Sequence, residues 1–493
     1  MKDLSIKEIS KLFEKELESS VSITGISYDS RNIKKGDIFV CLVGEKTDGH
    51  SYIKEAELKG AVTILAQKKI ESNLPVIYVE DTQIALAKLA NYFYNEPSKK
   101  IRIIGVTGTN GKTTTTHLIQ HILENSGNKT AIIGTLGTRE NTNSQYYDAK
   151  HTTPQSPELQ KSIKELLDKG FTHIGMEVSS HALSLHRVDE CNFAGTVLTN
   201  ITQDHLDFHL TMDEYAKAKK KLFKMLNESF WKNKYSVINK DEPLFNEFSK
   251  IIGKDIKIVS YGIKEKSDFQ AKNITYETTG VSFTLASPEG EYKVKSNLNG
   301  LFNVYNILAS ICAAYCESVK LEKIIPAVSN AKEVPGRFQI ITDKENSSSP
   351  VCIVDYAHTP DGLENILKAA KLMILKGKRL ICVFGCGGDR DPTKRPKMGK
   401  IAEDLSDLVI VTSDNPRSEN PNQIISDILS GIQNTSNIIV EPDRKAAIQA
   451  AIKKAKNGDV VVIAGKGHED YQILKDKTIH FDDREEVKKA LTC

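Results

Sequence analysis

The segment GVTGTNGKTTTTH, residues 105–117, constrains the fold most, because it joins an apolar strand to a helix through a turn of glycine and threonine. Backbone N–H groups of such a turn wrap polyphosphate, a following lysine reaches the outer phosphates, and the next hydroxyl can bind Mg²⁺. Lys112 and Thr113 hold those positions. The strict phosphate-loop pattern has glycine five residues before Gly111, where this chain has Val106. The segment therefore predicts an ATP or GTP site in a variant loop, and a purely structural turn is the competing interpretation.

Strand-like and helical segments alternate along the rest of the chain. Apolar runs such as HIGMEVSS and AGTVLTN are separated by helical stretches, which is typical of a mostly parallel sheet. A length of 493 residues exceeds what one hydrophobic core organises. Changes of pattern predict three α/β domains, over residues 1–99, 100–334 and 335–493. We expect a central sheet like that of P-loop ATPases and a Rossmann-like third domain.

Five short apolar runs of the third domain each end in polar or glycine residues. They are VCIVDYAH, RLICVFGCGGD, DLVIVTSDNPR, NIIVEPDR and DVVVIAGKGHED. Open α/β sheets bind ligands beyond the carboxyl ends of their strands. Two arginines near a glutamate suit a ligand with carboxylate and ammonium groups, because the arginine fork binds a carboxylate through two hydrogen bonds. For DNPR, a simple proline turn with a helix cap is the competing interpretation. The candidates are Asp355, His358, Arg390, Asn415, Arg417 and Glu469.

Candidate metal ligands follow two strands of the central domain. Glu177 and His205 are expected at the same sheet edge as the phosphate loop. Mg²⁺ prefers oxygen ligands, so Glu177 suits it better, and a hydrogen-bonded structural role is the competing interpretation for His205. Farther along, a helical segment carries a lysine run, which composition alone predicts to be a solvated face: Lys217, Lys219, Lys220 and Lys221.

The charge balance narrows the class of partner. The chain has 67 Lys and Arg residues against 64 Asp and Glu, a net charge of +3, which gives no electrostatic case for nucleic acid or an anionic membrane. No stretch reaches the ~18 apolar residues of a membrane helix, and the N-terminal segment lacks the apolar core of a signal peptide. We expect a cytoplasmic monomer whose partners are small molecules, with neither nucleic acid nor membrane among them.

Motifs spread over nearly the whole chain resemble those of the Mur ligases of peptidoglycan synthesis. They are GTNGKTT, EVSSH, NITQDHLDFH, LNGLFNVYN, PGRF, DYAHTP and GKGHE, in the family's order. YDSR, HTTP, GDRDPTKRPKMG and DNPR are similar to the members that add the third residue of the stem peptide. The resemblance implies a ligase that uses ATP and Mg²⁺ to join meso-2,6-diaminopimelate to the D-glutamate of UDP-N-acetylmuramoyl-L-alanyl-D-glutamate, through an acyl phosphate.

The resemblance also implies roles for single residues. ATP would be held by Gly108, Thr109, Asn110, Gly111, Lys112, Thr113, Thr114, Asn303, Arg337, Asp355 and His358. The UDP-muramoyl dipeptide would be held by Ser30, Thr152, Thr153, Ser179 and Arg187. Mg²⁺ would be held by Thr113, Glu177, His205 and Lys219 as a carbamate, and the catalytic set would be Lys112, Lys219 and His205.

Two of these implications are specific. The family carbamylates one lysine of an AKxxLF segment, which AKKKLF places at Lys219, and the resulting anion can lie beside Mg²⁺ where an ammonium would repel it. DNPR marks members that take meso-diaminopimelate, so Arg417 would bind the second carboxylate that lysine lacks, and Glu469 with the Gly465 carbonyl would hold the distal ammonium. The implied set is Arg390, Asp414, Asn415, Pro416, Arg417, Gly465 and Glu469.

Two other functions compete with the ligase. Folylpolyglutamate synthase shares the central ligase architecture, although YDSR in the first domain and DNPR in the third disfavour it. A nucleotide-dependent switch that forms no bond would also use a phosphate loop, but it would not need the carboxylate-binding set of the third domain. For the ligase, we expect the third domain to close on the central one when ligands bind.

Overall fold

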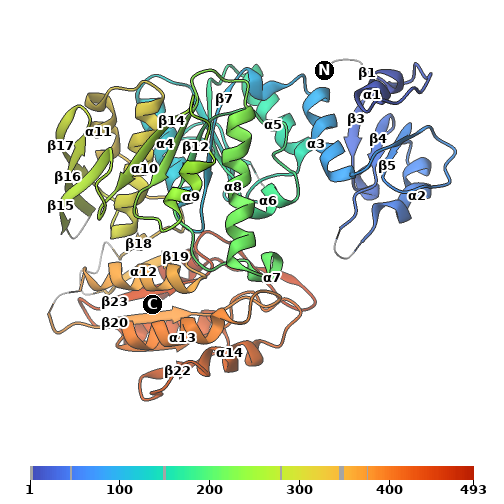
Figure 1. Cartoon of the computed structure of the whole chain (residues 1–493). Helices are drawn as coiled ribbons and strands as arrows, with labels where there is room; N and C mark the ends of the chain where they lie inside the picture. Colours follow the sequence, from blue (N-terminus) through green and yellow to red (C-terminus); the bar gives the residue numbers. More distant parts are fainter. Residues whose placement is uncertain are drawn as a thin grey trace.

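Three main sheets follow one another along the chain in the computed structural model (Figure 1). The structure describes residues 4–44, 47–147, 151–277, 280–343, 349–374 and 376–492. The predicted α/β class, with a mostly parallel central sheet and an α/β third domain, is confirmed. The predicted domain limits at residues 99 and 334 stay predictions. Within the described residues, no helix is long and apolar enough to cross a membrane.

The first sheet has four parallel strands in the order β3, β4, β5, β6. They span Gly25–Ser27, Asp37–Val40, Thr63–Ala66 and Val76–Tyr78. A small pair, β1 (Leu4–Ser5) and β2 (Ser22–Ile23), precedes it together with helix α1 (Ile6–Leu12). Helices α2 (Ile53–Leu58) and α3 (Thr82–Phe93) complete the unit, and α3 contacts the central domain through α5 (Ser156–Asp168). This domain lies at one end of the molecule, in blue (Figure 1).

The central sheet has eleven strands in the order β10, β9, β8, β11, β7, β12, β13, β14, β15, β16, β17. The strands from β8 to β15 run parallel, and both edges are antiparallel. Their bounds, in chain order from β7, are Arg102–Thr107, Thr130–Gly134, Gly137–Arg139, Tyr146–Tyr147, His173–Glu177, Phe193–Leu198, Tyr235–Asn239, Lys257–Gly262, Phe269–Glu277, Gly280–Ser287 and Gly290–Ser296.

Helices cover both faces of the central sheet. One core contains apolar residues of α4 (Lys112–Asn125), α10 (Leu301–Cys316) and α11 (Leu321–Ser329). The other contains residues of α5, α6 (Ser180–Ser184), α8 (Met212–Glu228) and α9 (Phe245–Lys250). The strands between them are almost wholly buried, which explains why they read as unbroken apolar runs in the sequence.

The third sheet has six strands in the order β18, β19, β23, β20, β21, β22, and all five predicted strands are present in it. The bounds from β18 are Gln339–Ile341, Val351–Asp355, Leu380–Phe384, Leu408–Val411, Ile438–Val440 and Val460–Ala464. Helices α12 (Pro360–Lys371), α13 (Lys394–Leu405) and α14 (Pro421–Leu429) share one core, and α15 (Arg444–Lys454) and α16 (Asp483–Leu491) share the other. A small hairpin joins β24 (Tyr471–Ile473) to β25 (Thr478–His480).

The third domain lies below the central one, where α7 (Leu206–His209) and one end of α8 reach the junction (Figure 1). Gln203, just before α7, contacts the third domain through both ends of its side-chain amide. Its Nε2 donates to Asp391 Oδ2 at 3.1 Å and to Thr393 Oγ1 at 3.2 Å, and its Oε1 accepts from Lys397 Nζ at 2.6 Å. The central strands therefore end against a surface supplied by a different domain.

Candidate active site

Two neighbouring cavities lie at this junction. The larger, of about 350 Å³, is lined by the phosphate loop, by residues after the central strands and by the start of α12. The smaller, of about 140 Å³, is lined mostly by turns after the strands of the third domain. Four residues line both cavities: Asp204, His205, Tyr356 and His358. Ligands in the two cavities would therefore meet at these four side chains.

Two glycines fix the shape of the phosphate loop. Gly108 and Gly111 have φ angles of +148° and +86°, in the region that favours glycine. A Cβ on Gly108 would lie 1.9 Å from Thr199 Oγ1, and one on Gly111 would lie 2.3 Å from Asn306 Oδ1. The loop then enters α4 at Lys112, so the N-terminus of a 14-residue helix faces the larger cavity. Such an N-terminus, with its free N–H groups, favours a bound anion.

Two lysine side chains converge under this loop. Lys112 Nζ donates to the carbonyls of Gly108 at 2.9 Å and Thr109 at 2.8 Å. Lys219 Nζ donates to the same Gly108 carbonyl at 2.9 Å. Burial lowers the pKa of both amines, and for Lys219 the nearby charge of Lys112 lowers it further, to well below its ordinary value. The lowered pKa makes the neutral amine of Lys219 more accessible than that of an exposed lysine, and a neutral amine is the form that can react with carbon dioxide.

The lysine run on α8 does not form one solvated face, as composition alone suggested. Lys217 is exposed, whereas Lys219 is 1% exposed. Tyr215, Leu222 and Leu226 are buried with it, at helical spacing on one face of α8. The Tyr215 ring lies 4.4 Å from Lys219 Nζ, and its hydroxyl is 3.1 Å from Thr109 Oγ1. That apolar spacing was the sequence signal that distinguishes Lys219 from its neighbours.

The candidate metal ligands Glu177 and Thr113 are in direct contact. Glu177 Oε2 accepts from Thr113 Oγ1 at 3.0 Å and from Thr135 Oγ1 at 2.9 Å. Arg337, from the third domain, donates to Thr113 Oγ1 at 3.1 Å. Burial lowers the pKa of His205 to about 3, so its imidazole is neutral and has a free electron pair for a metal.

These donors fit Mg²⁺ better than a transition metal. Among the described ranges of the chain, no three His, Cys, Asp or Glu side chains gather into a ready metal site. Mg²⁺ keeps several waters and takes substrate phosphate oxygens, so it needs only a few protein donors. A buried carboxylate, a hydroxyl and a buried lysine suited to carbamylation meet that need.

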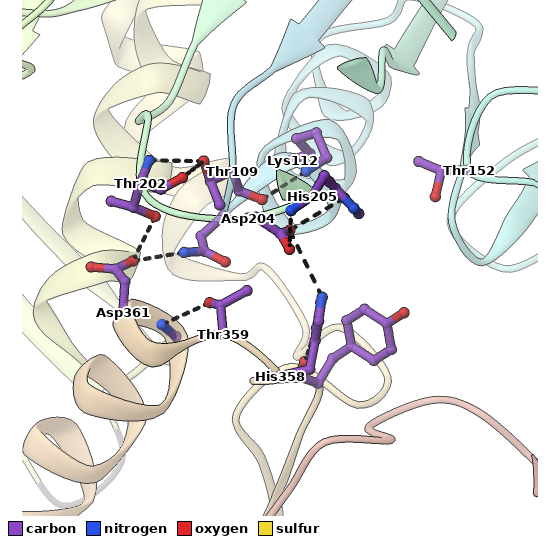
Figure 2. A network of polar contacts seen from close by, with 12 residues as sticks. Thr109, Lys112, Thr152, Thr202, Asp204, His205, His358, Thr359 and Asp361 are labelled. Carbon is purple, nitrogen blue, oxygen red and sulfur yellow. Dashed lines mark hydrogen bonds and ion pairs between the residues drawn. The ribbon is translucent and has the colours of Figure 1, made fainter. Parts of the chain in front are cut away.

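Polar contacts link the two domains across the larger cavity (Figure 2). Asp204 Oδ2 lies 3.2 Å from His205 Nε2 and 3.9 Å from His358 Nε2. Asn110, in the phosphate loop, donates to Asp361 Oδ2 at 2.6 Å, and Thr202 Oγ1 reaches the same oxygen at 3.5 Å. Figure 2 shows Thr152 apart from this network, on the other side of Lys112 and His205. The phosphate loop is thus bound directly to the first turn of α12.

Arg417 presents an open guanidinium to the smaller cavity. Its Nη1 donates to the Gly388 carbonyl at 2.7 Å, and Nε and Nη2 have no hydrogen-bond partner among the described residues. Its φ angle of +53° is unusual for a residue other than glycine, so the DNPR turn holds it in a strained backbone conformation. Arg390 lines the same cavity but is exposed, and its Nη1 donates to the carbonyl of its neighbour Asp389 at 2.9 Å. Arg417 is the better oriented of the two arginines.

Most of the predicted site residues line these two cavities. Those at the larger one are Thr109, Asn110, Gly111, Lys112, Thr113, Thr114, Thr152, Glu177, Ser179, His205, Lys219, Arg337, Asp355 and His358. Those at the smaller one are His205, His358, Arg390, Asp414, Asn415, Arg417, Gly465 and Glu469. Their individual roles stay predictions.

Six predicted residues line neither cavity: Ser30, Gly108, Thr153, Arg187, Asn303 and Pro416. Some of them support residues that do. Thr153 Oγ1 donates to the Glu177 carbonyl at 2.9 Å, and Arg187 Nη1 donates to the Thr153 carbonyl at 3.3 Å. Ser30 lies in the first domain, where its hydroxyl donates to Glu55 Oε2 at 2.8 Å.

Sequence reasoning missed three residues that line the site and one, Lys466, directly behind it. Asp204 and Lys466 stand inside quoted motifs, next to His205 and Gly465, but were not singled out. Tyr215 carries the helical-spacing signal described above. Asp361 follows DYAHTP at the start of a helix, and only the contact with Asn110, 251 residues earlier, reveals its place at the site.

Comparison with known proteins covers the chain from the first sheet to the third. Residues 22–94 match the Mur ligase family catalytic domain, residues 106–314 the Mur ligase middle domain, and residues 336–467 the Mur ligase glutamate ligase domain. The chain is 45% identical to a UDP-N-acetylmuramoyl-L-alanyl-D-glutamate–2,6-diaminopimelate ligase of Bacillus cereus, over 95% of this chain and 94% of the relative. It is also 45% identical to the protein of that name from Clostridium botulinum, over 99% of both chains.

Solved structures agree on the fold. A structure of a UDP-N-acetylmuramoyl-L-alanyl-D-glutamate–2,6-diaminopimelate ligase superposes with a TM-score of 0.69 at 33% identity, covering 100% of this chain and 99% of the other. The MurF ligase of Thermotoga maritima, solved with ADP, has a TM-score of 0.64 at 22% identity, covering 95% of this chain and 96% of the other.

Proposed function

This chain belongs to the Mur ligase family, and we propose that it is the ATP-dependent ligase that adds meso-2,6-diaminopimelate to UDP-N-acetylmuramoyl-L-alanyl-D-glutamate in peptidoglycan synthesis. One observation of the structure carries the proposal. The cavity with the phosphate loop and the cavity with the open Arg417 guanidinium adjoin and share four residues. A nucleotide-activated carboxylate and an amino acid with an extra carboxylate can therefore react at one junction.

The phosphate loop binds ATP in this proposal. The N–H groups at the start of α4 and Lys112 hold the phosphates, and Lys112 exchanges its loop carbonyls for phosphate oxygens. The γ-phosphoryl passes to the γ-carboxylate of the D-glutamyl end, giving an acyl phosphate and ADP. Arg337, already in contact with Thr113, adds positive charge where negative charge develops.

Thr113, Glu177, His205 and a carbamate on Lys219 would hold Mg²⁺. The ion would supply positive charge against the phosphates during transfer. Lys219 donates to the Gly108 carbonyl, so its carbamate would form directly under the phosphate loop. Thr135 fixes the orientation of Glu177 through its hydroxyl and its backbone N–H.

The amino acid enters through the smaller cavity. Arg417 binds the carboxylate that distinguishes diaminopimelate from lysine, and Asn415 and Glu469 also line that cavity. An amine at the reacting end attacks the acyl phosphate next to Asp204 and His358, phosphate leaves, and an amide bond remains. Because no protein nucleophile takes part, positioning supplies most of the rate enhancement.

The first domain binds the UDP end of the dipeptide substrate in this proposal, with Ser30 among its contacts. Thr152 and Ser179 line the larger cavity, and Thr153 hydrogen-bonds to Ser179 and Arg187, which suits a site for the muramoyl dipeptide. The cytoplasmic location, the monomeric state and the absence of nucleic-acid and membrane partners stay predictions.

Phosphate release should depend on all three substrates. We expect rapid release from ATP when the UDP-muramoyl dipeptide and meso-diaminopimelate are both present, and only background release when either is omitted. A coupled phosphate assay with product mass spectrometry measures this. Release without an amino acid would favour a switch protein, and turnover with folate and glutamate instead would favour a folylpolyglutamate synthase.

Gln203→Ala should weaken closure of the third domain. The substitution removes three hydrogen bonds across the junction, so we expect KM for diaminopimelate to rise about three- to tenfold. Small-angle scattering with all ligands bound should also give a larger radius of gyration than for the wild type. Gln423→Ala is the control, because among the described residues its amide hydrogen-bonds to Asp427 within the third domain and to no residue of the central domain. Unchanged scattering and KM in Gln203→Ala would contradict a role in closure.

A further inference from the structure

Lys466 is a fully buried lysine behind the wall of the smaller cavity, in contact with Asn415 and Glu469, which line it. Its side chain is 0% exposed, and Nζ lies 3.0 Å from Glu469 Oε2 and 3.4 Å from Asn415 Oδ1. The Tyr471 ring lies 5.3 Å from the same nitrogen. A lysine is almost never fully buried without a partner that needs its charge. Here the partner is Glu469, which lines the cavity and is 12% exposed.

The backbone of the GKGHED turn places this pair. Gly465 and Gly467 have φ angles of +122° and +54°. A Cβ on Gly465 would lie 2.5 Å from Asp414 Oδ2, and one on Gly467 would lie 2.6 Å from the Gly336 carbonyl. Between them, Lys466 points into the protein, and its carbonyl accepts from the Glu469 N–H at 2.9 Å. The turn therefore returns Glu469 directly over the lysine.

The two oxygens of Glu469 have different surroundings. Oε2 accepts from Lys466 Nζ and also from Asn415 Nδ2 at 2.8 Å. Asn415 is itself held, because its Oδ1 accepts from the Ile473 N–H at 2.9 Å. The other oxygen, Oε1, has no hydrogen-bond partner among the described residues. One oxygen is thus fixed by two donors, and the second is left for a ligand.

We propose that Lys466 is the positioning residue of the amino-acid site: it fixes one oxygen of Glu469 so that the other binds an ammonium group of the incoming amino acid. This inference rests on the proposed function. Lys466 does not touch the amino acid in this arrangement and acts through Glu469. Without it, a nearly buried carboxylate loses its counter-ion, and it then takes up a proton or turns toward solvent. Either change removes the acceptor for the ammonium.

Lys466→Met tests the role, because methionine keeps an unbranched side chain and removes the charge. We expect KM for meso-diaminopimelate to rise about 10- to 100-fold, as for the loss of a charge-assisted hydrogen bond. KM for ATP and for the UDP-muramoyl dipeptide should stay at the wild-type value, and kcat should change less than about threefold. Lys445→Met is the matched control, since that lysine is exposed in the same domain and forms an ion pair with Glu486 on the protein surface, away from both cavities. It should change none of these constants.

A double-mutant cycle separates positioning from folding. In a Glu469→Gln background, Lys466→Met should add little to the KM for diaminopimelate, because its effect acts through the missing carboxylate. Additive effects, a lower KM, or equal rises in all three KM values would overturn the proposal. If Lys466→Met does not fold, Lys466→Gln takes its place, because glutamine keeps a hydrogen-bond donor and removes the charge. An unchanged KM for diaminopimelate in Lys466→Gln would also contradict the proposal.

Measuring which amino acid the wild type turns over distinguishes a failure of this proposal from a failure of the proposed function. If the wild type uses an amino acid other than diaminopimelate, the proposed substrate is wrong, and the same cycle is measured with the amino acid that is used. If calorimetry shows that the wild type binds no amino acid, both proposals fail.

Discussion

Lys219→Ala lowers kcat by about 10³-fold and leaves KM for diaminopimelate within about threefold of the wild type, if the side chain carries a carbamate. The loss reflects the removal of an anion next to bound Mg²⁺ and the ATP phosphates, where charge changes during transfer. Lys219 lies wholly inside the protein and shares the Gly108 carbonyl with Lys112. Burial and the charge of Lys112 lower the pKa of this amine well below its ordinary value, which makes the uncharged form that adds carbon dioxide more accessible.

Lys220→Ala is the matched control for this result. Lys220 is the next residue on α8, is partly exposed and pairs with Glu247, so its removal should leave kcat unchanged. It also tests the position of the modification within the lysine run. Equal losses in the two variants would show that the helix as a whole, rather than one lysine, matters.

Two further measurements identify the modification itself. Carbon-13 NMR after growth with labelled bicarbonate should show one carbamate signal that Lys219→Ala lacks. A small carboxylate such as acetate should partly restore the variant, because it can place an anion in the space left by the side chain. A wild-type protein without the signal, and a variant that acetate does not restore, would refute the carbamate.

Arg417→Ala should lower kcat/KM for meso-diaminopimelate by about 10²- to 10³-fold, as expected for removing one member of a hydrogen-bonded charge pair. Its Nε and Nη2 have no hydrogen-bond partner among the described residues, and its Nη1 is held by the Gly388 carbonyl at the smaller cavity. Turnover of L-lysine should be slow in the wild type, because lysine leaves the guanidinium desolvated and unpaired. The variant should therefore lose most of the preference for diaminopimelate over lysine.

L-lysine is the control substrate for that prediction, and Arg390→Ala is the control variant. Arg390 is exposed and oriented by its own neighbour's carbonyl, so we expect a smaller loss, below about tenfold. Steady-state phosphate release with both amino acids gives all the values. Two results would show that Arg417 does not bind the second carboxylate. One is a wild type that prefers lysine, and the other is a loss of kcat/KM for diaminopimelate that is larger in Arg390→Ala than in Arg417→Ala.

Much of the fold was predictable because its signals are local. The phosphate loop is a strand, a glycine turn and a helix in one short segment, and the structure has β7, the loop and α4 in that order. The five apolar runs of the third domain became β19 to β23 for the same reason: each is short, buried and ended by polar residues. The positive φ angles at Gly108 and Gly111 also belong to the local turn, although close contacts with Thr199 and Asn306 add to the requirement for glycine.

The roles of other residues could not be decided from the sequence, because they depend on burial in the folded protein. From its residues alone, His205 was better explained as a hydrogen-bonded structural histidine. In the structure it lines the larger cavity, and burial lowers the pKa of its imidazole although the neighbouring Asp204 acts in the opposite sense. Composition predicted that the lysine run forms a solvated face. In the structure, Lys219 is buried with Tyr215 on one side of α8, whereas Lys217 is exposed. The residue types were visible, but their exposure was not.

The sequence by itself determined the order of strands and helices, the phosphate loop and the residue types at the strand ends, since each follows from neighbours in the chain. Only the tertiary structure decided which of those residues meet. Asn110 binds Asp361, Lys112 and Lys219 share one carbonyl, and Gln203 spans two domains. Such contacts join residues that are up to 251 positions apart, and they form because the third domain packs against the central one and α8 packs under the phosphate loop, which no local pattern encodes.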